Sequence, residues 1–202
     1  MHHENPKQKI HRDLLNLLNS NSSRHLLAAR DLAESFQPMA PLNRGDKLWW
    51  EGDDSPFLFY LEAGALVEVD TKGDGTSVLR LVVPGQLFWC EDVFFYQQAA
   101  QTAMRCLSQS PIWHLTKGDF ERIHAAHDLG FDLINALSLK TLGNYRSRTA
   151  QLVQLSPAKR LAHALNQYPA LLSLLTREEL ANFLSLSRSS LHRVLKQGYG
   201  RN

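Results

Sequence analysis

Residues 176–196, which read TREELANFLSLSRSSLHRVLK, decide the fold of this chain. Thr176 and Glu179 have the spacing of a capping box, which predicts a helix over residues 177–184. After a short turn, a second helix is expected from residue 188 to about residue 197. Apolar residues occupy the positions that hold two such helices near a right angle, with small Ala181 at the closest approach: Leu180, Leu184, Leu186, Leu191, Val194 and Leu195. The stretch therefore predicts a helix-turn-helix.

The turn of this unit is Ser185-Leu186, and Ser187 can cap the second helix. Such turns often carry glycine where Ser185 stands. The sequence therefore requires a left-handed backbone at a residue other than glycine.

The outward face of the second predicted helix is basic and polar. Arg188 and Arg193 suit two-pronged contacts with guanine edges in the major groove of DNA. The other hydroxyl, imidazole and ammonium groups of this unit suit contacts with phosphates. The residues that we expect to contact DNA are Thr176, Ser187, Arg188, Ser189, Ser190, His192, Arg193 and Lys196. An ordinary helical hairpin with a solvated basic face is the alternative.

The charge of the chain is unevenly distributed. Its formal net charge is +2, yet residues 141–202 contain nine Lys and Arg against two Asp and Glu. Residues 1–140 are net acidic. A basic C-terminal part behind an acidic body is typical of a phosphate-binding module attached to a sensor. A solubilising or membrane-attracted basic tail would have the same composition.

The first two thirds of the chain change from helical to β patterning. Apolar faces predict helices over residues 11–18 and 23–36. Residues 42–115 then alternate short aromatic and β-branched runs with turn signals, which predicts an all-β sandwich or barrel. The turn signals are Asn43-Arg44-Gly45-Asp46, Glu51-Gly52-Asp53-Asp54, Glu62-Ala63-Gly64, Gly73-Asp74-Gly75 and Pro84-Gly85. Gly73-Asp74-Gly75 lies between two such runs and predicts a hairpin.

A long helix is expected from residue 128, with Gly143 as its weak point. Its apolar stripe could form a dimeric coiled coil, pack on the β domain, or do both in different turns. The stripe contains Leu129, Leu133, Ile134, Leu137, Leu142, Tyr145 and Leu152, of which Leu133, Ile134, Leu137, Leu142 and Tyr145 are our predicted dimer contacts. Ser156-Pro157 predicts the start of a further helix to about residue 167. We expect an effector-type domain over residues 1–127, a connecting helix over 128–153 and a DNA-binding domain over 154–202.

Composition excludes several classes of protein. No apolar run is long enough to cross a bilayer and the N-terminus has no secretory h-region, so we expect a cytoplasmic protein without membrane contact. Two cysteines, Cys90 and Cys106, cannot build a four-cysteine zinc or iron–sulfur site. Because the sequence has no nucleophile elbow, phosphate loop or metal-ligand cluster, we expect no enzyme activity.

With these parts in this order, residues 41–197 resemble the catabolite activator/fumarate–nitrate regulator (CRP/FNR) family of bacterial transcription factors. The resemblance implies an α+β fold: an N-terminal β-roll of the cyclic-nucleotide-binding jelly-roll type flanked by helices, a long connecting helix and a C-terminal helix-turn-helix. It also implies double-stranded DNA, a second copy of the chain and RNA polymerase as partners. Arg188 and Arg193 match the two base-reading arginines of the family, whereas Ser189 replaces its glutamate.

The nucleotide-binding motif of the family is degenerate here. Members that bind cyclic nucleotides carry a Gly-Glu pair and then an Arg-Ser or Arg-Thr pair, whose arginine holds the phosphate. In this chain no cation stands at that position and Arg105 lies beyond it, so we expect no response to cAMP or cGMP. The residues that we place in the effector pocket are Trp89, Cys90, Glu91, Thr102 and Met104.

Other effectors stay open. Haem would use His114, Cys90 or Cys106 as axial ligand, although no haem-ligation pattern is present, so no cofactor is expected. A thiol switch at either cysteine is a further alternative.

The sequence finishes at residues 197–202, where family members continue into a β-hairpin wing, so we expect fewer phosphate contacts and less apolar cover for the helix-turn-helix. Three functions follow as hypotheses: a DNA-binding regulator that has lost its nucleotide pocket, a sensor of another effector, or a module whose basic end docks on a protein or membrane.

Overall fold

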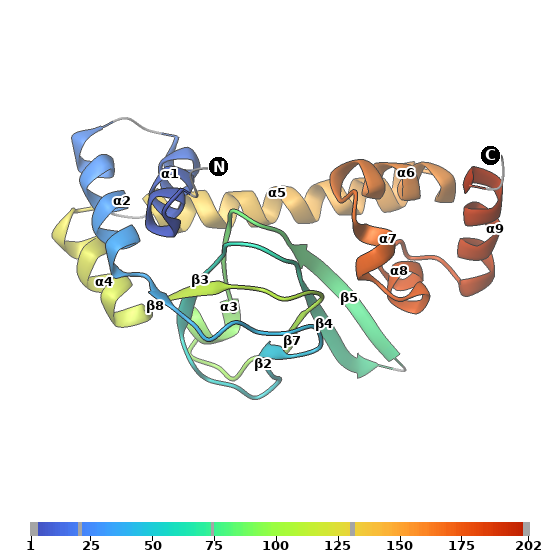
Figure 1. Cartoon of the computed structure of the whole chain (residues 1–202), viewed down its shortest axis with the longest axis horizontal. Coiled ribbons are helices and arrows are strands. Elements are labelled where there is room, and N and C mark those ends of the chain that lie inside the picture. The colour runs from blue at the N-terminus through green and yellow to red at the C-terminus, as the bar shows by residue number, and fades with distance from the viewer. Residues whose placement is uncertain (1–3, 20–21, 74, 130–131, 200–202) are drawn as a thin grey trace.

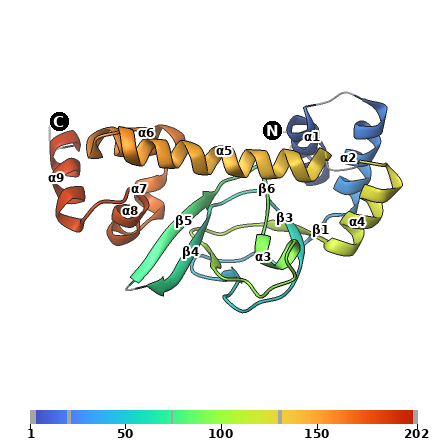
Figure 2. The same cartoon turned by 180° about the vertical axis from the view of Figure 1, so that it is seen from behind.

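The computed structural model describes residues 4–19, 22–73, 75–129 and 132–199. Its helices are α1 (Pro6–Leu18), α2 (Ser23–Ser35), α3 (Glu91–Phe94), α4 (Lys117–Ala126), α5 (Asp132–Gln154), α6 (Pro157–Gln167), α7 (Leu171–Leu174), α8 (Arg177–Phe183) and α9 (Arg188–Tyr199). Its strands are β1 (Gln37–Pro38), β2 (Lys47–Trp49), β3 (Phe57–Leu61), β4 (Leu66–Gly73), β5 (Gly75–Val82), β6 (Gln86–Trp89), β7 (Ala103–Cys106) and β8 (Ile112–Thr116). Helix α5 runs along the roll from α1, α2 and α4 at one end to α6–α9 at the other (Figures 1 and 2).

The strands form two four-stranded antiparallel sheets, in the orders β1-β8-β3-β6 and β2-β7-β4-β5. Aromatic side chains fill the space between them: Trp49 stacks on Phe59 with ring centroids 5.8 Å apart, and Phe59 stacks on Phe88 at 5.5 Å. Strands β4 and β5 pair from Leu66 opposite Val82 outward, as the predicted hairpin requires, although Asp74 itself lies outside the described residues. The expected jelly-roll fold with flanking helices is confirmed.

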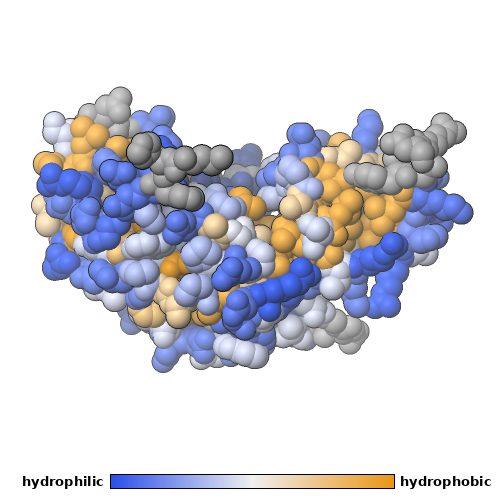
Figure 3. All heavy atoms as spheres, viewed as in Figure 1, coloured by the Kyte–Doolittle hydropathy of each residue, from blue (hydrophilic) through white to orange (hydrophobic). Residues whose placement is uncertain are grey.

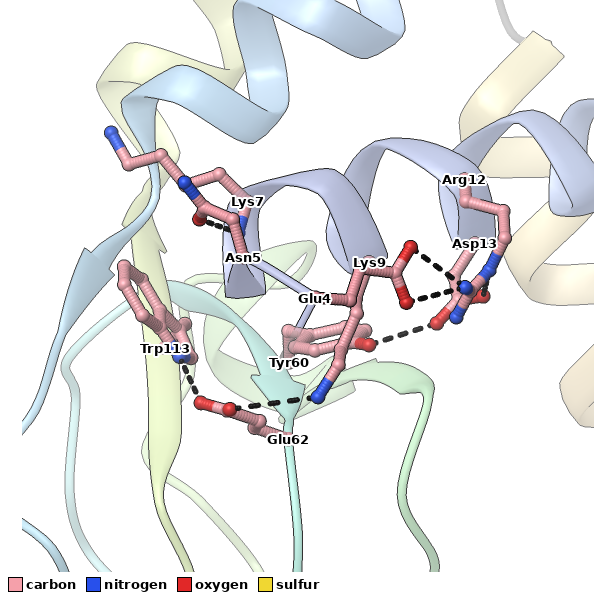
Figure 4. A network of polar contacts seen from close by, with 9 residues as sticks. All are labelled: Glu4, Asn5, Lys7, Lys9, Arg12, Asp13, Tyr60, Glu62 and Trp113. Atoms are coloured by element: carbon pink, nitrogen blue, oxygen red, sulfur yellow. Dashed lines mark hydrogen bonds and ion pairs between the residues drawn. The ribbon is translucent and has the colours of Figure 1, made fainter. Parts of the chain in front are cut away.

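Helix α1 is tied to the first sheet by polar contacts (Figure 4). The hydroxyl of Tyr60 donates to Asp13 Oδ2 at 2.8 Å. Glu62 accepts from Trp113 Nε1 at 2.9 Å and lies 3.8 Å from the ammonium of Lys9. These contacts fix the N-terminal helices on the roll, where they cover the first turns of α5.

Two predicted helix starts are wrong. Helix α1 begins at Pro6 rather than at residue 11, because Asn5 accepts from Lys7 N as its N-cap and Pro6 stands at the first helical position. Helix α5 begins at Asp132, not at Asp128. Asp128 has a left-handed φ of 46°, and the chain there closes the end of α4.

Candidate nucleic-acid interface

The helix-turn-helix is formed by α8 and α9, as the sequence predicts. Thr176 and Glu179 make both bonds of the capping box: Glu179 N donates to Thr176 Oγ1 at 3.2 Å, and Thr176 N donates to Glu179 Oε2 at 2.8 Å. The predicted contact residues of the two helices are buried or half-buried: Leu180, Ala181, Leu184, Leu186, Leu191, Val194 and Leu195. The apolar pattern is therefore used to pack α8 and α9 together.

The turn between these helices has the predicted left-handed residue, because Ser185 has a φ of 52°. Arg160 of α6 stabilises it by donating to the carbonyl of Leu184 at 2.7 Å and to that of Ser185 at 3.3 Å. Leu186 N donates to the Ala181 carbonyl at 2.8 Å. Hydrogen bonds from Arg160 therefore stabilise a left-handed turn that has no glycine.

The outward face of α9 is open to solvent. Its exposed residues are Arg188, Ser189, His192, Arg193 and Lys196. Ser187 caps the helix, since Ser190 N donates to Ser187 Oγ at 3.1 Å, and the Ser187 hydroxyl also contacts those of Ser189 and Ser190. Within the described part of the chain, His192, Arg193 and Lys196 form no ion pair, and all three side chains are exposed.

Arg188 has a partner that the sequence reasoning missed. Its Nη2 lies 2.7 Å from Glu178 Oε2, and both side chains are well exposed. Exposed pairs of this kind contribute about 0–1 kcal/mol to stability. Glu178 therefore holds Arg188 loosely at the start of α9.

Beside α9 lies a groove of about 450 Å³ between α7, α8 and α9. Its lining contains four leucines and three potential cations: Leu172, Leu175, Leu180, Leu195, Arg177, His192 and Lys196. Apolar residues are visible on the surface of these C-terminal helices (Figure 3).

The structure does not bring the five predicted effector residues to one cavity. Trp89 stacks on Phe94 in the cluster beneath the N-terminal helices. Cys90 and Met104 belong to the aromatic core of the roll. Glu91 and Thr102 join a different group, a buried ion-pair cluster around Arg80.

Arg80 of β5 is a buried cation that the sequence reasoning also missed. Its Nε lies 2.6 Å from Glu68 Oε2, its Nη1 lies 3.5 Å from Glu91 Oε1, and its Nη2 donates to the carbonyl of Trp89 at 2.9 Å. Thr102 donates to the other oxygen of Glu68 at 2.7 Å. Burial lowers the pKa of Arg80, but the two carboxylates outweigh it and the net shift is upward. Arg80 is therefore paired within the roll by two carboxylates.

A cavity of about 120 Å³ lies between β5, β6 and α5 and reaches α6 and α8. Polar side chains line it beside apolar ones, including Arg80, Gln86, Lys140, Asn144, Tyr145, Arg148, Gln151 and Gln167. It is smaller than the roughly 300–1,000 Å³ of sites for drug-sized ligands. None of the five predicted effector residues lines it.

The residues named for haem or thiol chemistry have structural contacts. His114 packs edge-on against Phe57 with ring centroids 5.0 Å apart. Cys90 and Cys106 are both free and buried, and burial raises the pKa of each thiol to about 11. Across the residues that the structure describes, no three His, Cys, Asp or Glu side chains gather in a way that could hold a metal ion.

The predicted dimer stripe is divided between two surroundings. Leu133 and Leu137 are buried against the N-terminal helices of the same chain, with Ile134 packed beside them. Leu142 and Tyr145 are exposed, as are Leu139 at 67% and Val153 at 80%. The free apolar residues therefore lie on the later turns of α5. None of the helices described is long and apolar enough to span a bilayer.

Comparison with known proteins identifies a family model and solved structures that are similar to this chain. Residues 40–127 match the family model of the cyclic nucleotide-binding domain. No curated protein sequence matches the chain. Among solved structures, the c-di-GMP responsive global regulator CLP of Xanthomonas campestris is similar at 15% identity and a TM-score of 0.65, over 86% of this chain and 91% of that chain.

Two further structures share the fold. FixK2 of Bradyrhizobium japonicum is 15% identical, with a TM-score of 0.65 over 82% of this chain and 85% of its own. The catabolite activator protein of Thermus thermophilus is 21% identical, with a TM-score of 0.53 over 91% and 86%. The fold that the CRP/FNR resemblance implied is confirmed.

Proposed function

We propose that this chain, a protein of CRP/FNR type with a cyclic nucleotide-binding domain, is a sequence-specific regulator that binds double-stranded DNA as a homodimer and does not respond to cAMP or cGMP. The observation that carries the proposal is the outward face of α9. Arg188, His192, Arg193 and Lys196 are exposed on it, while the opposite face packs into the core. A helix of this kind enters the major groove with its side chains against base edges.

The exposed later turns of α5 support the dimer. Leu139, Leu142 and Val153 follow a three-four spacing along α5, in which Arg146 and Thr149 occupy the two intermediate positions. This spacing is that of a two-stranded coiled coil. A two-fold dimer would present two copies of α9 to a palindromic site. RNA polymerase as a partner stays a prediction.

The cluster around Arg80 supports the lack of a cyclic-nucleotide response. A cyclic phosphate that bound the guanidinium of Arg80 would have to displace Glu68 or Glu91, and a displaced Glu68 would stay buried without a counter-ion. The small cavity beside α5, which both polar and apolar side chains line, favours a second candidate function, which is response to a smaller effector.

The test is selection of bound sequences from random duplex DNA by the purified chain, without added ligand. We expect enrichment of a two-fold symmetric site whose half-sites lie about one helical turn apart. Arg193→Ala should then cost about 1–3 kcal/mol at that site and leave binding to random DNA nearly unchanged.

The matched control is Arg122→Ala, because Arg122 is an exposed arginine on α4 at the other end of the molecule. The affinity of the Arg122→Ala variant for the selected site should match that of the wild type. Equal losses for Arg193→Ala on specific and random DNA would reduce its role to phosphate neutralisation. No enriched sequence, with or without cAMP, would refute the proposed function.

A further inference from the structure

The second sheet ends at β5, which is its last strand and has a β-sheet partner on one side only. The pairing with β4 shifts register there: Val78 lies opposite Val69 and Arg80 lies opposite Glu68, so Leu79 is an extra residue in β5. A bulged edge strand leaves backbone groups that need partners from outside the sheet.

The helix-turn-helix and α5 supply these partners. Val78 N donates to Asn182 Oδ1 of α8 at 2.6 Å. Arg148 of α5 donates to the carbonyls of Val78, at 2.8 Å, and of Leu79. The same guanidinium donates to the carbonyl of Phe183 at the end of α8, at 3.2 Å, and lies 4.8 Å from the centre of its ring. One arginine therefore joins α5, the edge of the roll and the helix-turn-helix.

The chemistry of Arg148 fixes the relative orientation of the elements that it joins. Its described hydrogen bonds all go to carbonyl oxygens, and its burial lowers the pKa of the guanidinium. A planar guanidinium with five fixed donors satisfies three carbonyls in one relative orientation only, which a flexible ammonium would not impose.

Further contacts hold the same arrangement. Arg105 of β7 forms an ion pair with Glu179 of the capping box, and Arg44 donates to the carbonyl of Leu174 at 3.1 Å. One apolar cluster includes residues from the β4–β5 hairpin and from the helix-turn-helix. Because Arg188, Arg193 and Lys196 stay exposed in this arrangement, docking of the helix-turn-helix leaves the outward face of α9 uncovered.

We propose that Arg148 is a positioning residue that sets the half-site spacing this regulator accepts, by locking the helix-turn-helix to α5. The inference rests on the proposed dimeric DNA binding. If the dimer axis runs along α5, the separation of the two α9 helices follows from how each is held to α5. One added base pair moves a half-site by about 3.4 Å and turns it by about a tenth of a helical turn. A locked unit cannot follow such a step, whereas a released one can.

The experiment uses the full chain and a panel of duplexes in which the two selected half-sites are moved apart or together in single base-pair steps. The wild type should lose about 100-fold in affinity at a spacing changed by two base pairs, because the second half-site is no longer engaged. Arg148→Gln should lose less than about tenfold over the same change. Its affinity for an isolated half-site should equal that of the wild type.

The control is Lys140→Gln, which removes one positive charge from α5. Among the residues that the structure describes, Lys140 forms no hydrogen bond or ion pair with β5 or α8, so the variant should keep the wild-type spacing profile. Asn182→Ala removes the other edge contact and should relax the profile as Arg148→Gln does, so the inference stays testable if one variant fails to fold. A wild-type profile in both variants would overturn the role of Arg148. Failure of the wild type to bind any symmetric site would instead refute the proposed function.

Discussion

At the scale of single residues, the roll contains a cation bound by its own side chains. Arg80 satisfies Glu68 and Glu91 at once, so three ionisable groups share a net negative charge in a largely buried place. Removing Arg80 would leave two uncompensated carboxylates, which costs far more than the cluster itself contributes. The two carboxylates are therefore not equivalent, because one guanidinium cannot fully compensate both.

Glu91 is the carboxylate whose negative charge Arg80 compensates least. Burial raises its pKa, and Arg80 opposes only part of that shift. A folded-state pKa above the unfolded value means that the folded chain binds more protons, so this group's contribution to stability increases as the pH falls through that pKa and is lost as the pH rises. We expect Glu91→Gln to raise the melting temperature by about 2 °C at pH 8. The gain should shrink at pH 5. Melting curves followed by circular dichroism check this, and a lower melting temperature at pH 8 would contradict it.

The two thiols lead to a prediction about redox sensing. Burial raises the pKa of Cys90 and Cys106 to about 11, so only about one thiol in a thousand or fewer is ionised near pH 7.5. The native chain should therefore react with a thiol-specific aromatic disulfide far more slowly than free cysteine does. In urea it should titrate two thiols at once. A fast native thiol, assigned with Cys90→Ser, would revive the thiol-switch hypothesis.

At the scale of elements, α5 has two different surroundings along its length. Its first turns complete the cluster of the N-terminal helices, and its later turns expose Leu139, Leu142 and Val153. The sequence predicts the apolar stripe but not which turns face which partner. Periodicity reports that a face is buried, whereas the occupant of that face depends on where α1 and α2 dock.

The exposed turns predict a specific oligomerisation defect. Leu142→Glu would place two like charges opposite each other at the dimer seam, where their desolvation and repulsion oppose association. We expect sedimentation to show a monomer for this variant and a dimer for the wild type. Leu26→Glu, an equally drastic change at an exposed leucine of α2, should leave the dimer intact. A dimeric Leu142→Glu chain would move the interface away from α5.

At the scale of the whole molecule, what the sequence predicts well is local. The capping box of Thr176, the left-handed Ser185 and the β4–β5 hairpin depend on neighbours within a few residues. Arg80 and Arg148 could not be assigned from the sequence, because their partners lie in other elements and an isolated arginine in a strand or helix has no pattern of its own. The same holds for the docking of the helix-turn-helix, which depends on a bulge in β5.

This docking predicts how the molecule unfolds. The roll and the helix-turn-helix share one apolar cluster, so neither can open without exposing part of the other's core. All four tryptophans, Trp49, Trp50, Trp89 and Trp113, lie within the roll, whereas most helical residues lie outside it. Tryptophan fluorescence and the helical dichroism signal should therefore follow one coincident urea transition. Arg148→Gln should separate them, with helical signal lost at lower urea, because the C-terminal unit then opens on its own. Two separate transitions already in the wild type would mean that the shared cluster does not couple the two parts.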